Sequence, residues 1–168
     1  MKKIAVIITD MFQDVEYQQP ADAFRKAGHE VVHVGISAGS VVKGEYGTHV
    51  QIDKAVRDVS ADDFDALFIP GGYSPDRLRI DADAVRFAKE FFTKKKPVFE
   101  ICHAAQLLIT AQVLEGRRVT GWTSLVQDIK NAGAEYVDAE VVVDRNLVSS
   151  RKPADIPAFI RESLAMLQ

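Results

Sequence analysis

The chain has 168 residues, a formal net charge of −3 and a single cysteine. This length suits one domain, residues 1–168, whose core can be stable without metals, and one cysteine excludes an internal disulfide. Charges of both signs are dispersed and no apolar run approaches the roughly 20 residues of a membrane span, so we expect no nucleic-acid or membrane partner and a reducing, cytoplasmic environment.

The first half of the chain alternates apolar, often β-branched runs with a helical pattern. Such runs indicate strands that are buried on both faces, and they cover residues 3–9, 30–36 and 66–69. Asp14 can cap a helix that reaches about Lys26, and Gly28 stands where a C-cap glycine belongs. The apolar stripe of this helix would comprise Val15, Ala21, Phe24 and Ala27. Short runs at 41–43 and 49–52 suggest a hairpin, and 60–63 suggests a turn or short helix.

The second half continues the alternation. Helices are predicted over 81–96, after residue 101, over 124–132 and over 153–167, and β structure over 97–101, 117–121, 135–143 and 147–150. Lys94, Lys95 and Lys96 read as a solvated helix end, where cations complement the helix dipole. The turn between the last two strands would be 144–146. Strands that alternate with helices predict a doubly wound α/β sandwich, a mostly parallel central sheet with helices on both faces.

This architecture predicts where a ligand would bind. In doubly wound sheets the crevice lies beyond the carboxyl ends of the strands. The loops after Thr9, after Ile69, after Ile101 and around Gly121 share that edge. It would bring together Glu16, the Gly71–Gly72 pair and the Cys102–His103 pair. This closeness follows from the architecture and not from sequence spacing.

Cys102 is the chemically distinctive residue of this edge. A short apolar run ends in this cysteine and continues directly into an amphipathic helical pattern. A strand that turns sharply into a helix exposes the residue at the turn to the amide-rich first turn, where an anion is favoured, so we expect a low thiol pKa. The alternative is an ordinary buried cysteine, because free cysteine is among the most buried residue types.

Several segments spread over nearly the whole chain resemble one family. They are Phe12–Tyr17, Phe64–Gly72, Ile101–His103 with Gln106, Asn131–Gly133, and Val148–Arg151 followed by Pro153–Asp155. In these segments the sequence resembles the PfpI-like superfamily, also called ThiJ/PfpI, which includes intracellular cysteine peptidases, protein deglycases and glyoxalase-type enzymes. The resemblance implies a flavodoxin-like sandwich.

The resemblance also implies roles for individual residues. Cys102 would be the nucleophile, with Glu16 close to its sulfur and His103 as its partner. The backbone N–H groups of Gly72 and His103 would form an oxyanion hole. An acidic residue would come from a neighbouring subunit, and Asp76 matches that position, which implies a homo-oligomer of two or more copies.

Three residues depart from the family pattern around the cysteine. Glu100 precedes Ile101 where a small apolar residue is common, and a carboxylate on a central strand is costly unless it is paired or faces solvent or a subunit interface. Ala104 and Ala105 replace a Gly-Pro pair. A methyl group at Ala104 would crowd a place where substrate passes close to the backbone, whereas Ala105 is harmless in a helix.

Each implied role has a structural alternative. Glu16 in the first turn of a helix can simply complement the dipole, and the imidazole of His103 can face solvent while its backbone shapes the turn. Arg151 can bind an anion near the edge or hold its loop together, and Trp122 can line the mouth of the site. No glycine-rich nucleotide loop and no metal-binding cluster is present, so we expect no cofactor and no metal.

Two classes of function remain open. In the first, the protein is a stress-related hydrolase in which Cys102 attacks the carbonyl carbon of a peptide, an aldehyde or a glycated adduct. In the second, the protein is a redox-sensing or stress-protective module in which Cys102 is oxidised and nothing is turned over. The sequence favours the enzyme because nucleophile, carboxylate and glycines occur together.

Overall fold

A seven-stranded sheet forms the centre of the computed structural model, which describes all of residues 1–168. Its strands are β1 (Lys3–Ile7), β2 (Glu30–Gly35), β5 (Lys54–Ala55), β6 (Ala66–Ile69), β7 (Val98–Ile101), β10 (Val142–Asp144) and β11 (Leu147–Ser150). Their spatial order is β10-β11-β7-β6-β1-β2-β5, and every pair is parallel except β10 with β11. The mostly parallel sheet that the sequence predicts is therefore confirmed, with β1 ending at Ile7 instead of Thr9.

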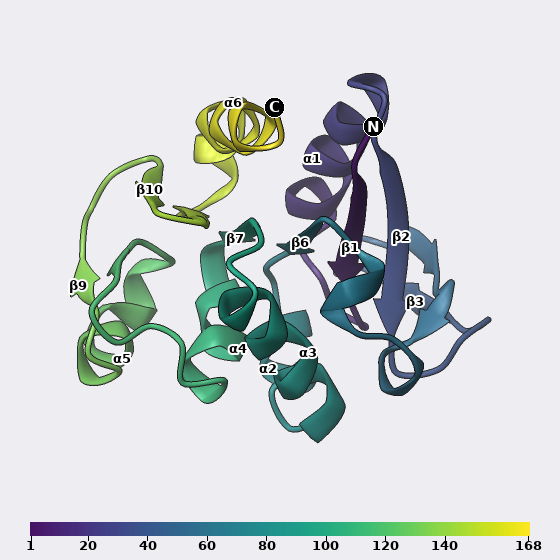
Figure 1. The fold of residues 1–168 in the computed structure, drawn as a ribbon, viewed down its shortest axis with the longest axis horizontal. Helices are drawn as coiled ribbons and strands as arrows, with labels where there is room; N and C mark the ends of the chain where they lie inside the picture. Colours follow the sequence, from purple (N-terminus) through teal and green to yellow (C-terminus); the bar gives the residue numbers. More distant parts are fainter.

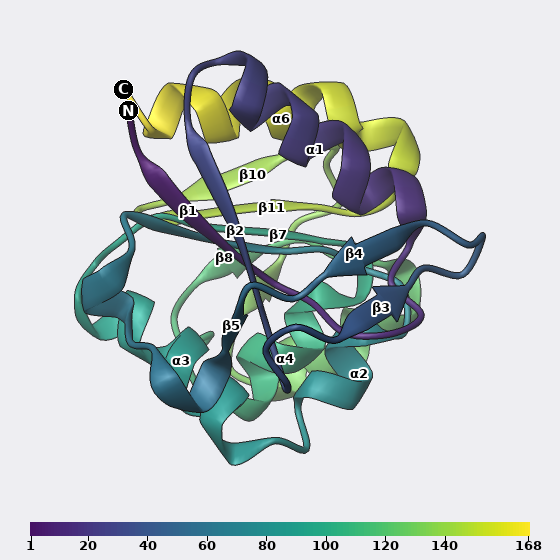
Figure 2. The same ribbon diagram turned by 90° about the vertical axis from the view of Figure 1, so that its right-hand side faces the viewer.

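Helices cover both faces of this sheet (Figures 1 and 2). They are α1 (Asp14–Lys26), α2 (Ser74–Leu78), α3 (Ala82–Thr93), α4 (Ala105–Thr110), α5 (Val126–Asn131) and α6 (Ile156–Met166). Figure 2 shows α1 and α6 side by side over one face, with α2, α3 and α4 beneath the other. None of the helices combines the length and the apolar composition that crossing a membrane requires.

Two separate apolar cores result from this layering. On the α1 and α6 side, rings from a helix and two neighbouring strands pack together, with Phe24 5.7 Å from both Phe68 and Phe99 between ring centroids. On the other side Phe87 of α3 packs edge-on against Phe64 and Phe91. Aromatic pairs in these geometries stabilise the fold beyond their buried area, so both cores contribute to holding the helices on the sheet.

Two smaller sheets lie beside the central one. The predicted hairpin is confirmed as β3 (Val41–Lys43) paired antiparallel with β4 (His49–Gln51). The β structure predicted over 135–143 consists of two strands: β9 (Glu135–Tyr136) pairs in parallel with β8 (Arg118–Val119), whereas β10 pairs with β11. Both halves of that segment are strands, but each has a different partner, so the chain passes from one sheet to the other between them.

The start of α1 differs from the sequence prediction. Gln13 is the N-cap, and its side chain accepts a hydrogen bond from the Glu16 N–H. Asp14 is instead occupied outside the helix, where its carboxylate accepts from the N–H groups of Tyr46 and Thr48 at 2.9 Å each. The buried face also shifts, because Val15 and Ala27 are exposed. The residues of the helix that pack inward are Glu16, Tyr17, Pro20, Ala21 and Phe24.

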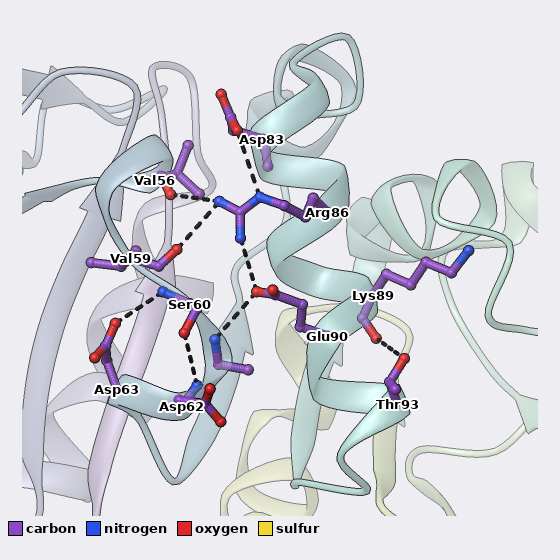
Figure 3. A network of polar contacts seen from close by, with 12 residues as sticks. Val56, Val59, Ser60, Asp62, Asp63, Asp83, Arg86, Lys89, Glu90 and Thr93 are labelled. Atoms are coloured by element: carbon purple, nitrogen blue, oxygen red, sulfur yellow. Dashed lines mark hydrogen bonds and ion pairs between the residues drawn. The ribbon is translucent and has the colours of Figure 1, made fainter.

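Arg86 ties α3 to the segment that precedes β6 (Figure 3). Its guanidinium donates to the carbonyls of Val56 at 3.0 Å and Val59 at 3.2 Å, and pairs with Glu90 at 2.9 Å. In the same segment the predicted turn or short helix is a single 3₁₀ turn, Ala61–Asp63, capped by Ser60. These contacts fix the segment before β6, at the end of the parallel strands opposite Cys102.

The lysine run after α3 is more than a solvated helix end. α3 stops at Thr93, and Lys94 pairs with Asp62 at 2.6 Å. Lys96 is half-buried, and its ammonium donates to the carbonyls of Ala61 and Phe64 at 2.7 Å each. The prediction is wrong for Lys96, because the 3₁₀ turn before β6 offers carbonyl acceptors within reach.

Candidate active site

Cys102 lies at a sharp turn between a strand and a helix. β7 ends at Ile101, a 3₁₀ turn covers Cys102–Ala104, and α4 begins at Ala105. The backbone φ of Cys102 is 64°, a left-handed conformation that is strained for a residue with a Cβ. The predicted strand-turn-helix geometry is confirmed, and the thiol side chain is turned out of the sheet, although the residue is only 7% exposed.

A pocket of about 390 Å³ opens over this turn. The residues that line it are Gln13, Glu16, Glu45, Tyr46, Gly72, Tyr73, Cys102, His103, Trp122 and Pro153. Four of the residues that the sequence assigns to a site, Glu16, Gly72, Cys102 and His103, therefore lie in one pocket. The carboxyl edge of the parallel strands brings them together, as the architecture predicts.

The side chain of His103 faces the cysteine sulfur. Its Nδ1 lies 3.4 Å from Cys102 Sγ, so the imidazole is not simply turned to solvent. Burial lowers the pKa of His103, and the charge of Asp76 opposes that shift only in part. A histidine with a lowered pKa is neutral at pH 7, and in the tautomer whose proton is on Nε2 its Nδ1 can accept the thiol proton.

Glu16 lies fully buried beside the cysteine. Burial raises the pKa of Glu16 to about 8, with a smaller contribution of the same sign from the charge of Glu45. The carboxyl group is therefore protonated at neutral pH. In that form it is uncharged and can donate a hydrogen bond to the cysteine sulfur when negative charge develops there.

The acidity of Cys102 differs from the sequence prediction. Burial raises the pKa of the Cys102 thiol, and an ionised Glu16 would raise it further, whereas the N–H of His103 acts in the opposite direction. The low thiol pKa expected from the helix start is thus opposed by desolvation. Because Glu16 keeps its proton below about pH 8, the repulsion that its charge would cause is absent at neutral pH.

Two glycines make the close packing at the turn possible. A Cβ at Gly71 would collide with Glu16 Oε1 and lie 2.9 Å from the Cβ of Cys102. Gly72 has a φ of 79°, and a Cβ there would collide with Gln13 N. The N–H of Gly72 donates to no acceptor within the chain, and that of His103 lies at the cysteine sulfur. Both N–H groups border the pocket, where an oxyanion hole would need them.

Asp76 is placed differently from the other candidates. The segment from Ser74 to Leu78 is the short helix α2, in which Ser74, Pro75 and Leu78 are buried. Asp76 itself is exposed and does not line the pocket. It raises the pKa of His103 through its charge but makes no hydrogen bond with it in this chain.

The departures from the family pattern have different consequences from those expected. Ala104 is fully buried in the core on the α3 side and does not border the pocket, so its methyl group does not crowd a substrate. Glu100 is also fully buried, and neither of its carboxyl oxygens has a hydrogen-bond partner. Burial raises the pKa of Glu100, and the charge of Glu16 adds to that effect, so the uncharged acid is the form that fits this position.

Sequence reasoning missed the segment that forms one wall of the pocket. Glu45 and Tyr46 lie at the tip of the β3–β4 hairpin, which Asp14 holds against the start of α1. Gly44 permits this contact, because a Cβ there would lie 2.5 Å from Asp14 Oδ1. The glycines that flank Glu45 and Tyr46 between two short strands are the feature of the sequence that could have indicated a closely packed turn here.

Two further residues are placed clearly. Trp122 lines the pocket as suggested, with its ring 6.3 Å from that of His103 between centroids. Arg151 binds Asp155 at 2.9 Å and Asp138 at 2.9 Å, which supports its loop-holding role. No group of three or more histidine, cysteine, aspartate or glutamate side chains is arranged to hold a metal ion.

Curated relatives match this chain over nearly its full length. A Bacillus subtilis protein named "Putative cysteine protease YraA" is 54% identical over 167 residues, 99% of each chain. General stress protein 18 of the same organism is 56% identical, covering 99% of this chain and 98% of its own. Protein/nucleic acid deglycase 2 of Escherichia coli is 54% identical with the same coverage.

A solved structure and a family model agree with these relatives. A two-domain protein from Anabaena variabilis, with DJ-1/ThiJ/PfpI-like and ferritin-like domains, superposes with a TM-score of 0.97 at 38% identity. The match covers 99% of this chain and 48% of that protein, so this chain spans about half of it. The model of the DJ-1/PfpI family matches residues 2–166. The chain therefore belongs to the DJ-1/PfpI family.

Proposed function

We propose that this protein is a cofactor-independent cysteine hydrolase of carbonyl compounds, located in the cytoplasm. The observation that carries the proposal is the 3.4 Å contact between Cys102 Sγ and His103 Nδ1 inside the pocket. A nucleophile within reach of a neutral base is the arrangement that nucleophilic catalysis requires. Relatives named "Putative cysteine protease YraA" and "Protein/nucleic acid deglycase 2" support the hydrolase assignment.

The first chemical step follows from the protonation states at the site. Cys102 Sγ forms a bond to the carbonyl carbon, its proton passes to His103 Nδ1, and the C=O electron pair moves onto oxygen. The N–H groups of Gly72 and His103 would stabilise that oxyanion. Protonated Glu16 donates to the sulfur and so limits the cost of charge in a buried position.

The later steps depend on the leaving group. For an amide, the carbon–nitrogen bond breaks, the amine takes the proton from His103, and a thioester remains that water hydrolyses. For a glycated adduct with a ketone beside its hydroxylated C–N carbon, attack at the ketone forms a thiohemiketal, and the C–N bond then breaks as the neighbouring hydroxyl proton passes to the leaving amine. Collapse of the thiohemiketal returns its proton to Cys102 and releases the dicarbonyl compound. We favour a small adduct over an extended peptide, because the thiol is only 7% exposed and its pocket measures about 390 Å³.

The test compares both substrate classes with one matched variant. The purified protein is incubated with a methylglyoxal adduct of an N-acetylated amino acid, and separately with a fluorogenic peptide. We expect release of the unmodified N-acetylated amino acid from the adduct, and we expect Cys102→Ser to reduce this release to the uncatalysed rate. Faster cleavage of the peptide would support the peptidase assignment instead.

The same samples address the redox alternative. Equal rates for the wild type and Cys102→Ser on both substrates would refute the hydrolase. Mass spectrometry after mild peroxide treatment would then show whether Cys102 gains oxygen atoms, which is the outcome expected of a redox-sensing module.

A further inference from the structure

A second pocket, of about 620 Å³, lies at the opposite edge of the sheet from Cys102. It adjoins Pro97, which precedes β7, whereas Cys102 follows that strand. Three of its lining residues are cations, Lys95, Arg117 and Arg145, and none is acidic. This volume falls within the range of about 300–1,000 Å³ that small-molecule sites occupy.

Arg117 is held in this pocket, and some of its N–H hydrogen-bond donors have no acceptor in the chain. The residue is only 9% exposed, and its guanidinium lies over the ring of Phe92 at 5.0 Å from the centroid. One amino group donates to Asp144 O at 3.2 Å and to Asn146 Oδ1 at 2.8 Å. The Nε–H and the other amino group donate to no acceptor in the chain. A guanidinium that is held in place and has unpaired N–H groups can donate hydrogen bonds to the oxygen atoms of an anion.

A second cation lies close to this buried guanidinium. Burial lowers the pKa of Arg117, and the positive charge of Arg145 lowers it further. Arg145 is 62% exposed at its side chain, and its Nε is 3.4 Å from a carboxyl oxygen of Asp144. Lys95 contributes a third charge from a left-handed turn with φ 56°. Of these three cations only Arg145 is paired with a carboxylate, that of Asp144, which leaves about two positive charges for a ligand.

The lining also includes an apolar part. Phe92 and Met166 border the pocket together with Pro97. Inorganic anions make no use of such a surface, whereas an organic anion can bury its carbon atoms there. The charge and the lining of the pocket therefore favour a small organic ligand that combines a doubly charged anionic group with an apolar part.

We propose that this pocket, formed by Lys95, Arg117 and Arg145 with Phe92 and Met166, binds a small organic phosphate. The phosphate oxygens take the free N–H groups of Arg117 and pair with Arg145 and Lys95. The apolar body of the ligand lies against Phe92 and Met166. Binding here is independent of the chemistry at Cys102.

Isothermal titration calorimetry of the full chain tests this site with phenyl phosphate, inorganic phosphate and phenol as probes. We expect saturable binding of phenyl phosphate, weaker binding of inorganic phosphate and no binding of phenol. Arg145→Ala should weaken phenyl phosphate binding by about tenfold, because it removes a charged donor from an exposed position. Lys95→Gly, which keeps the left-handed turn, should also weaken it.

Matched controls separate this site from general electrostatics and from the active site. Arg161, whose side chain is also 62% exposed, lies on α6, and Arg161→Ala should leave the affinity unchanged. Cys102→Ser should do the same. The proposal is overturned by the absence of phenyl phosphate binding, by equal affinity in Arg145→Ala, or by loss of binding in Cys102→Ser. If Arg117 only braces the turn before β11, Arg145→Ala will not change the titration.

Discussion

Glu16 and Cys102 lie against each other at the turn between β7 and α4 because position 71 has no side chain. Glu16 comes from the first turn of α1 and Cys102 from the end of β7, and a Cβ at Gly71 would meet both. A fully buried carboxyl group beside a buried thiol is costly for the fold unless the carboxyl is protonated. The reactivity of Cys102 therefore depends on whether the carboxyl group of Glu16 is protonated.

Gly71→Ala should separate these two groups. We expect a loss of hydrolytic activity of at least about tenfold, because a displacement of about 1 Å can cost on the order of a hundredfold. The collision should also lower the free energy of unfolding by about 1–3 kcal/mol. Activity assays and urea unfolding measure the two effects.

Gly39→Ala is the matched control for this substitution. Gly39 has a φ of 81° and no atom within 4 Å of an added Cβ. Its substitution should cost about 1–2 kcal/mol of stability through the left-handed backbone alone. Full activity in Gly71→Ala would show that position 71 does not control the Glu16–Cys102 contact.

Glu16→Gln should change the pH dependence of stability. The pKa of Glu16 is raised from 4.5 to about 8 in the folded protein. A raised carboxyl pKa gives a contribution that is fully present below about pH 4.5 and is lost as the pH rises towards 8, by at most about 5 kcal/mol. The amide does not titrate, so the variant should gain stability relative to the wild type over that range.

Urea unfolding at several pH values between 4.5 and 9 measures this gain. Glu30→Gln, at the exposed start of β2, is the control and should show no such trend. A constant difference in unfolding free energy between Glu16→Gln and the wild type would mean that Glu16 is ionised throughout.

Ala104→Gly should leave turnover unchanged. Because the methyl group is buried in the core and not in the pocket, its removal costs about 1–2 kcal/mol of stability and frees no space for substrate. Ala165→Gly, on the exposed side of α6, should cost about 1 kcal/mol, from helix propensity alone. A rise in turnover in Ala104→Gly would restore the crowding explanation.

We expect the protein to form a dimer or a larger homo-oligomer. Asp76 is exposed and makes no hydrogen bond with His103 of its own chain, and the neighbouring Tyr73 and Ile80 expose most of their apolar side chains. An interface over α2 would cover these side chains and bring a carboxylate to a partner's histidine. Light scattering at micromolar concentration measures the mass, and a monomer would leave Asp76 without its implied role.

The sequence predicts the layout of the fold better than the local contacts. Buried strands such as Ala66–Ile69 can be predicted from the sequence because both faces of a parallel strand are apolar, which gives a continuous apolar run. The edge that gathers Glu16, Gly72 and Cys102 follows from topology. The cap at Gln13 and the buried ammonium of Lys96 could not be predicted from the sequence. Gln13 caps the helix because Asp14 is held by Tyr46 and Thr48, and Lys96 binds Ala61, and all three of these partners are distant in the chain.

The same limit applies to the chemistry of the site. The position of Cys102 at a strand-to-helix turn is a local property and is legible in the sequence. Its acidity is set by burial and by Glu16, which lies 86 positions earlier in the chain. Ala104 was misjudged for a different, local reason: the side to which its methyl group points depends on the left-handed backbone of Cys102.

The most direct test of the account is the pH dependence of Cys102 alkylation by iodoacetamide in the wild type and in Glu16→Gln. Cys102 is the single thiol, so the rate reports on it alone. We expect similar rates below pH 7 and a rate ratio, variant over wild type, that grows by about tenfold above pH 8 as Glu16 ionises and suppresses the thiolate. A ratio that stays constant from pH 6 to pH 10 in folded protein would show that Glu16 does not control the reactivity of Cys102.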